Sequence, residues 1–120
     1  MKIRFDVEGT PLTATLDDTE AARDFASLLP LTLTLEDYTS TEKVSDLPRK
    51  LSTAGAPAGT AASAGDITYY APWGNLALVY RSFGYAAGLV RLGRFDAGAD
   101  AQPALRRPGP LTAKIERMED

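Results

Sequence analysis

Short stretches of alternating apolar and polar residues recur along this chain, and turn residues separate them. The clearest is residues 31–35, in which leucine and threonine alternate without a break. Successive side chains of a β-strand point to opposite faces, so this pattern predicts strands with one buried face. Because about seven or eight such stretches accompany only one helical segment, we expect a closed antiparallel barrel rather than a parallel sheet, which needs more crossover helices.

The one main helix is expected at about residues 18–29. Asp17 and Glu20 have the three-residue spacing of a capping pair at a helix start. Pro30 ends the helix, because the residue before a proline disfavours the helical conformation. Strands at 3–7 and 12–16 come before it and form a hairpin with one buried face.

The second half of the chain predicts further strands on either side of tight turns. Residues 65–80, GDITYYAPWGNLALVY, indicate two strands joined by a turn at 72–75. Residues 89–95 and 111–118 complete the set, with Gly93 at a bulge.

The remaining segments are expected to lie outside the main strands. Polar residues 36–46 indicate rim structure with a short strand near Tyr38 or Val44, and residues 46–51 indicate one helical turn. The small residues of 52–64 predict a mobile loop. Residues 82–88 indicate a loop rich in aromatics and glycine, and residues 96–110 indicate turns.

Composition excludes several kinds of chemistry. The chain has 120 residues, which fits a single domain spanning residues 1–120. It contains no cysteine and no histidine, so thiol nucleophiles, Ser-His-Asp triads and histidine metal sites are impossible. The net charge of −3 favours neither nucleic acid nor an anionic membrane as a partner.

No window approaches the roughly 18 apolar residues of a membrane span, and the first residues lack the apolar run of a signal peptide. We therefore expect no membrane contact and a cytoplasmic location.

Several motifs resemble a known family when they are taken together in order and spacing. They are SLLPLTL at 27–33, Glu42, GDITYYAP at 65–72 and LGRF at 92–95. In these residues the chain resembles the bacterial cyclophilin-like family, small stand-alone domains without an assigned reaction. The resemblance implies a cyclophilin-like barrel of about eight antiparallel strands with helical caps.

True cyclophilins catalyse proline cis/trans isomerisation with the arginine of a Phe-His-Arg motif and a Gln-Gly-Gly-Asp stretch. Both motifs are missing from this chain. The departure leaves open whether the chain is an enzyme, because a fold does not carry its function with it.

The candidate ligand-binding residues cluster around the central hairpin. Strand alternation places Tyr69 and Tyr70 on opposite faces, so one belongs to the core and the other is free to line a pocket. Trp73, the only tryptophan, lies in a turn, where it either lines a pocket or caps the barrel. Arg81 and Phe83 form either a recognition loop or an exposed strand end.

Acidic residues give a further candidate. Glu42 stands where the resembled family has a glutamate, and we expect it to accept a hydrogen bond from a ligand or to pair with Arg81. Together with Glu36, Asp37 and Asp46 it could instead hold a divalent cation, but the spacing of a calcium loop is absent. A solvated rim is the favoured interpretation, so no metal and no cofactor are expected.

Two smaller motifs are best explained by structure. Gly65 and Asp66 are typical of a turn. Residues 106–110, with two arginines among prolines and glycine, predict a rigid turn rather than a nucleic-acid site.

Three functions are compatible with these residues. The first is a non-catalytic or weakly catalytic binding domain whose site, formed by Glu42, Tyr70, Trp73, Arg81 and Phe83, holds a small molecule or a short proline-containing peptide. The second is a peptidyl-prolyl isomerase in which Arg81 replaces the usual arginine. The third is an assembly module that acts through exposed strand edges. The sequence determines neither the ligand nor the oligomeric state.

Overall fold

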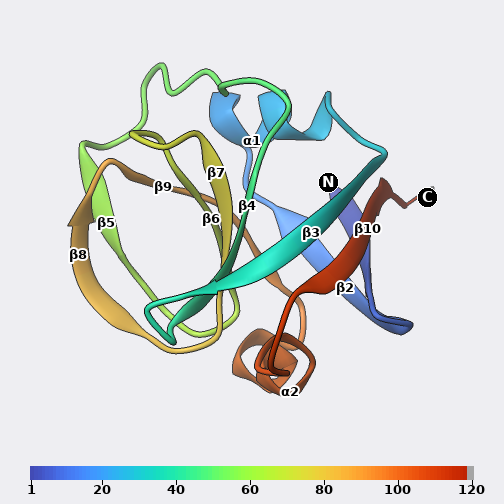
Figure 1. Ribbon diagram of the computed structural model, residues 1–120. Helices are drawn as coiled ribbons and strands as arrows, with labels where there is room; N and C mark the ends of the chain where they lie inside the picture. The colour runs from blue at the N-terminus through green and yellow to red at the C-terminus, as the bar shows by residue number, and fades with distance from the viewer. Residues whose placement is uncertain (119–120) are drawn as a thin grey trace.

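Eight strands form a closed antiparallel barrel, and a separate two-stranded sheet lies beside it (Figure 1). The computed structural model describes residues 1–118. In the order in which neighbours pair, the barrel strands are β1 (Lys2–Val7), β10 (Leu111–Arg117), β3 (Leu31–Tyr38), β4 (Glu42–Asp46), β7 (Asn75–Val79), β6 (Asp66–Tyr70), β9 (Leu89–Phe95) and β2 (Thr10–Leu16). The predicted closed antiparallel barrel of about eight strands is confirmed.

The barrel interior is filled by the apolar side chains that the alternation predicts. On β3, Leu33 and Leu35 are buried whereas Thr34 between them is exposed. The rings of Phe5 and Phe95 meet edge to face inside the barrel, with their centroids 4.9 Å apart. Burying one such side chain contributes about 1.5–3 kcal/mol to folding. The interior is therefore a packed core, and a ligand site has to lie elsewhere.

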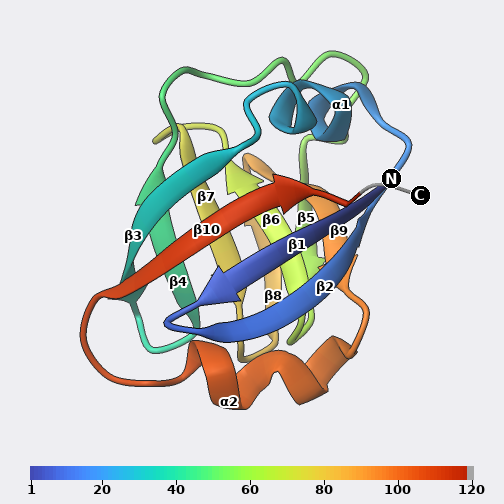
Figure 2. The same cartoon turned by 90° about the vertical axis from the view of Figure 1, so that its right-hand side faces the viewer.

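Short helices cover the two ends of the barrel (Figure 2). One end carries α1 (Glu20–Ala26), whose residues Ala21, Ala22, Phe25 and Ala26 are buried. The other carries a 3₁₀ turn (Gly98–Ala101) that leads directly into α2 (Gln102–Leu105). The sequence indicated only turns in this second region.

The main helix is shorter than the expected range of 18–29 and begins at a different capping residue. Thr19 is the N-cap, because its side-chain oxygen accepts a hydrogen bond from the Ala22 N–H at 3.2 Å. The expected cap, Asp17, instead forms an ion pair with Arg91 of β9 at 3.1 Å.

Two segments expected to be loops are strands. Within 52–64, residues 59–62 form β5 (Gly59–Ala62), and within 82–88 lies β8 (Phe83–Ala87), which pairs with it antiparallel. We call this pair the outer ribbon, because it packs on the outside of the barrel through a small apolar cluster that includes Ala62, Val79 and Leu89. Glycine and alanine make up most of both strands, and this tertiary contact adds to their weak intrinsic preference for a strand.

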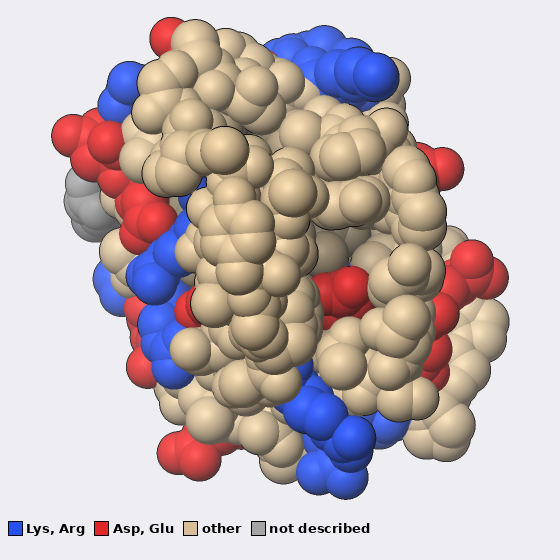
Figure 3. Space-filling model, turned by 90° about the vertical axis from the view of Figure 1, so that its left-hand side faces the viewer, with Lys and Arg blue, Asp and Glu red and all other residues tan. Residues whose placement is uncertain are grey.

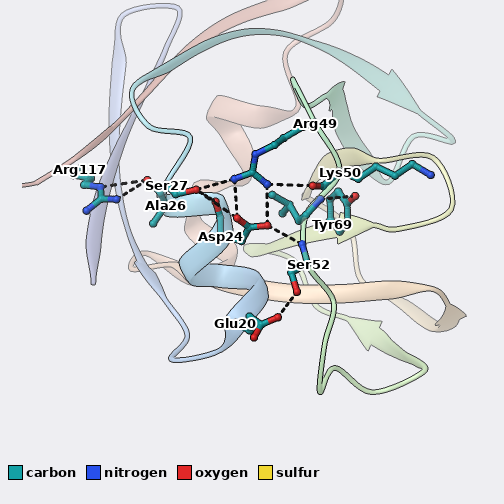
Figure 4. Close-up of polar contacts among 10 residues, drawn as sticks. Glu20, Asp24, Ala26, Ser27, Arg49, Lys50, Ser52, Tyr69 and Arg117 are labelled. Atoms are coloured by element: carbon teal, nitrogen blue, oxygen red, sulfur yellow. Dashed lines mark hydrogen bonds and ion pairs between the residues drawn. The ribbon is translucent and has the colours of Figure 1, made fainter.

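The chain between β4 and β5 is tied to α1 by a polar network (Figure 4). The Arg49 guanidinium donates to both carboxylate oxygens of Asp24, at 2.7 and 3.0 Å, and the Ser52 N–H donates to Asp24 at 2.7 Å. The Leu51 N–H donates to the buried Tyr69 hydroxyl at 3.1 Å. The expected helical turn at 46–51 is wrong, because these contacts hold the segment in an irregular path.

In the described part of the chain, residues 1–118, no helix has the length and apolar character that crossing a membrane requires.

Candidate functional site

A cavity of about 290 Å³ lies between the barrel's outer face and the outer ribbon. On this side of the molecule the surface is hollowed, mostly uncharged atoms surround the hollow, and acidic atoms appear at its edge (Figure 3). The cavity is lined by Tyr38, Thr39, Thr41, Glu42, Val44, Tyr70, Trp73, Asn75, Ala77, Phe83, Ala86 and Leu89. We call it the aromatic cavity.

Strand β7 explains why the cavity lies outside the barrel. Leu76 and Leu78 belong to the barrel core, so Asn75 and Ala77, which alternate with them, face the opposite side and line the cavity. All five residues of β7 are buried, because the outer ribbon covers the side that would otherwise meet water. The small side chain of Ala77 leaves the space that a larger residue would fill.

Glu42 begins β4 and is paired with Val79 of β7. Only 9% of its surface is exposed, and its Oε2 atom has no hydrogen-bond partner among the described residues. Burial raises the pKa of its carboxyl group above the usual range. A buried polar atom without a partner costs about 1–3 kcal/mol, so this side chain is placed at the expense of stability.

Asn75 repeats this pattern on the neighbouring strand. It begins β7, between Asp46 of β4 and Tyr70 of β6 in the register. Its surface is 6% exposed, and its Oδ1 atom also lacks a partner within residues 1–118. Buried polar groups in folded proteins are nearly always hydrogen-bonded, so two such atoms in one cavity indicate a place for a ligand or ordered water.

Aromatic rings form the outer part of the cavity. Tyr38 and Tyr70 each pack edge to face against Trp73, with ring centroids 5.3 Å apart in both pairs and the planes nearly perpendicular. Trp73 keeps 56% of its surface exposed and Tyr38 keeps 40%. These rings contact one another at the surface instead of entering the core, which is the arrangement of a recognition surface.

The structure brings together four of the five residues expected in the site. Glu42, Tyr70, Trp73 and Phe83 all line the aromatic cavity, whereas Arg81 does not. As the alternation predicts, Tyr69 is buried in the core and Tyr70 lines the cavity.

Arg81 lies just beyond β7 with its side chain exposed, and its backbone N–H donates to the Thr41 carbonyl at 3.1 Å. Within residues 1–118 it forms no ion pair, so the expected alternative of a Glu42–Arg81 pair is wrong.

The acidic residues near Glu42 do not gather around a cation. Asp37 accepts from the buried Lys43 ammonium at 2.8 Å and from the Tyr80 hydroxyl at 2.7 Å. These bonds hold the pKa of Asp37 below its usual value, and burial together with Asp37 raises the pKa of Tyr80 to about 12. Among the described residues no group of carboxylates is placed to hold a metal ion.

Asp66 serves the turn that the sequence predicts. One of its carboxylate oxygens accepts from the Ser63 N–H at 2.8 Å, and the other accepts from Arg94 at 2.6 Å. Its hydrogen-bonding capacity is used within the fold, and it does not line the aromatic cavity.

A second, larger cavity of about 550 Å³ lies beside α1, between that helix and residues 54–60. Its charged side chains are engaged with other protein groups, as in the Arg91–Asp17 pair at 3.1 Å and the Arg23–Asp18 pair at 2.5 Å. It contains neither of the two unpartnered buried oxygens, so among the described residues no buried side-chain oxygen or nitrogen in it lacks a hydrogen-bond partner that a ligand would supply.

Comparison with known proteins shows to which family this barrel belongs. The family model described as the cyclophilin-like family matches residues 5–116. The chain belongs to the cyclophilin-like family. The solution structure of a hypothetical protein from Archaeoglobus fulgidus has a similar fold, with a TM-score of 0.72 and 16% identity over 98% of this chain and 95% of that chain. No curated protein matches the chain.

The motifs by which the chain resembles the cyclophilin-like family lie near the cavity as well as in the core. Residues 27–33 run from the end of α1 into β3, and residues 65–72 form β6 and the turn that precedes Trp73. Membership of this family brings no characterised reaction or ligand, so the function has to be argued from the site itself.

Sequence reasoning missed Tyr38 and Asn75 as members of the site. Tyr38 ends a strand that was expected to stop at Leu35, and Asn75 stood in a turn. Counting the alternation backwards from Leu76 and Leu78 would have placed Asn75 on the outer face, but an outer face of β7 normally meets water. The alternation of β7 could therefore be read from the sequence, but the outer ribbon that covers its outer face could not.

Proposed function

We propose that this chain is a non-catalytic or weakly catalytic binding domain that holds a small molecule or a short peptide in the aromatic cavity. One observation carries the proposal: Glu42 and Asn75 both line the aromatic cavity, and each has a buried side-chain oxygen without a hydrogen-bond partner among the described residues. Concave, mostly apolar pockets with a few convergent polar groups are the usual form of ligand sites. The cytoplasmic location and the bacterial origin stay predictions.

The isomerase alternative receives less support from the geometry. Its mechanism needs a guanidinium that donates to the prolyl nitrogen and so lowers the barrier to rotation. The described residues that line the cavity include no arginine, and Arg81 lies outside it. NMR exchange on an Ala-Pro peptide is expected to be unaffected by the parent protein and by Arg81→Ala alike.

Trp73 offers a direct test of binding. As the only tryptophan it makes the intrinsic fluorescence a reporter of the cavity, and its partial exposure leaves it accessible to a ligand. A fragment library is screened against the full chain by a shift in this fluorescence and in the Trp73 indole N–H signal in NMR spectra.

The matched control for the screen is Arg81→Ala, which removes a nearby side chain that does not line the cavity. Fragments that bind the parent are expected to bind this variant equally well. If no fragment perturbs Trp73 or the amides around Glu42 and Asn75, the cavity is not a binding site and the proposal fails.

A further inference from the structure

The charges around the aromatic cavity are unbalanced. Glu42 is the only residue with a formal charge among those that line it. The adjacent Lys43 is fully occupied elsewhere, since its ammonium donates to Asp37 at 2.8 Å and to the carbonyls of Arg107 and Gly109 at 2.8 and 3.1 Å. An ionised Glu42 therefore has no counterion from the described part of the chain.

The unpartnered atoms are hydrogen-bond acceptors. Glu42 Oε2 accepts when the carboxyl group is ionised, and Asn75 Oδ1 is an amide oxygen. A ligand that satisfies both has to bring donors, and a positively charged N–H group forms the stronger bond with a carboxylate. An anionic ligand would instead add a like charge beside Glu42.

The rings of the cavity favour the same kind of ligand. Tyr38, Tyr70 and Trp73 surround its outer part with two nearly perpendicular pairs, so ring faces point in different directions. The face of an aromatic ring carries partial negative charge and attracts cations, most strongly for tryptophan. Ring faces and a buried carboxylate in one cavity thus form two independent sources of attraction for a positive group.

We propose that the ligand of the aromatic cavity is a small organic cation with N–H donors, a protonated amine or amidine. Its N–H groups meet Glu42 and Asn75, and the three rings enclose the rest of the charged group. This inference rests on the proposed function, because it names the class of ligand for the same site. The volume of about 290 Å³ lies at the lower end of ligand pockets, which suits a ligand with a single ring or a short chain.

The test compares probes of one shape and different charge. Benzylamine and benzamidine are cations, benzyl alcohol is neutral and benzoate is an anion, and all four carry the same ring. Titration of the full chain, followed by NMR chemical shifts around Trp73, is expected to show the two cations binding about tenfold or more tightly than the alcohol, and benzoate not binding.

Two variants locate the effect. Glu42→Gln keeps the shape of the side chain and removes its charge, so affinity for benzylamine is expected to fall about tenfold while affinity for benzyl alcohol changes little. Glu116→Gln makes the same chemical change on β10, which contributes no residue to the cavity, and is expected to leave both affinities as they are.

A third cation tests whether the positive group of the natural ligand belongs to a peptide side chain or to a free small molecule. Lysine with both backbone ends capped carries its amine on a peptide-like frame. Binding of this compound as tightly as benzylamine supports the cation and indicates a peptide side chain, whereas weaker binding supports the cation and indicates a free small molecule.

The outcomes separate the two proposals. If benzyl alcohol or benzoate binds in the cavity as tightly as the cations, or if Glu42→Gln leaves benzylamine affinity unchanged, the cation inference is overturned and the binding function survives. The inference is equally overturned if the cations do not bind while other fragments occupy the cavity. If nothing binds there at all, both proposals fail.

Discussion

At the scale of single residues, Glu42 is the side chain that favours function at the expense of stability. Its carboxyl group is buried in the aromatic cavity with one oxygen unpartnered, and burial raises its pKa. Because the pKa of Glu42 is higher in the folded than in the unfolded state, the group favours folding at pH values below its unfolded pKa. That contribution is lost as the pH rises through the folded pKa.

Glu42→Gln is therefore expected to stabilise the fold at neutral pH. At about pH 7, above the usual pKa of a glutamate, the raised pKa makes the buried carboxyl group of the parent unfavourable to folding, so the variant's free energy of unfolding is expected to be higher by about 1 kcal/mol. At about pH 4 both carry a neutral side chain, and the difference is expected to shrink. Urea denaturation at the two pH values measures it, and a variant less stable than the parent at neutral pH would refute this view of Glu42.

Gly93 is the residue whose replacement is expected to damage the barrel seam. It lies in β9 opposite Leu16 of β2, and an added Cβ would overlap the Thr15 carbonyl oxygen and lie 2.9 Å from the Leu16 Cα. Gly93→Ala is expected to cost about 1–3 kcal/mol in urea denaturation. Gly84→Ala is the control, because a Cβ there meets no atom within 4 Å.

The residues of the site differ in how far sequence could predict them. Tyr70 and Trp73 could be predicted. Strand alternation places Tyr70 on the face opposite Tyr69, and the turn places Trp73 at the surface. Arg81 was placed in the site by its charge and its position after a strand. Alternation gives it the same face as Asn75 and Ala77, but it lies beyond the end of β7, and its exposed side chain does not line the cavity. Asn75 was missed because the residue pattern around it predicts a turn, and the patterns of both strands of the outer ribbon predict loops.

At the scale of elements, strands with strong alternation were predicted and strands held by tertiary contacts were not. β1, β2, β3 and β10 follow the period of two, whereas in β9 a register shift against β6 interrupts it. β5 is made of glycine, threonine and alanine, and its pairing with β8 and its packing near Val79 decide its structure. Such contacts are non-local and leave no periodic trace in the sequence.

The connection between β4 and β5 is expected to loosen in acid. Arg49 and the Ser52 N–H hold the pKa of Asp24 at about 2, below its usual value of 3.8. Its contribution to stability is therefore present above pH 3.8 and is lost as the pH falls toward 2.

Asp24→Asn removes this contribution at neutral pH. We expect a loss of about 1 kcal/mol, moderated because Arg49 is half exposed, and faster hydrogen exchange at the Ser52 amide. Asp6→Asn, near the end of β1, where the carboxylate accepts from the Gly9 N–H, is the control for exchange at Ser52. Should Asp24→Asn and the parent be equally stable at neutral pH, the network in Figure 4 would not be what holds the segment.

Filling the space under the outer ribbon is expected to abolish binding without harming the fold. Ala77→Leu places a larger side chain on the cavity floor, where the ribbon leaves room. Affinity for any bound fragment is expected to fall about tenfold or more, and the free energy of unfolding is expected to stay within about 1 kcal/mol of the parent. A variant that binds as the parent does would show that ligands do not use this cavity.

At the scale of the whole molecule, a packed barrel interior leaves a ligand only the outside. The outer ribbon turns one patch of that outside into a cavity, and the end of β3, which carries Tyr38, and the turn that carries Trp73 supply rings to it. The barrel could be predicted because its alternation is encoded strand by strand. The cavity could not, because it is formed where β3, β4, β6, β7 and β8 meet.

The most direct test of the central claim is a two-dimensional NMR titration of the full, isotopically labelled chain with a fragment mixture that includes the four ring probes. The account predicts that the largest shifts fall on the Trp73 indole and on amides of β4, β6 and β7 around Glu42 and Asn75. Shifts that gather instead in the larger cavity beside α1, or no shifts with any fragment, would contradict it.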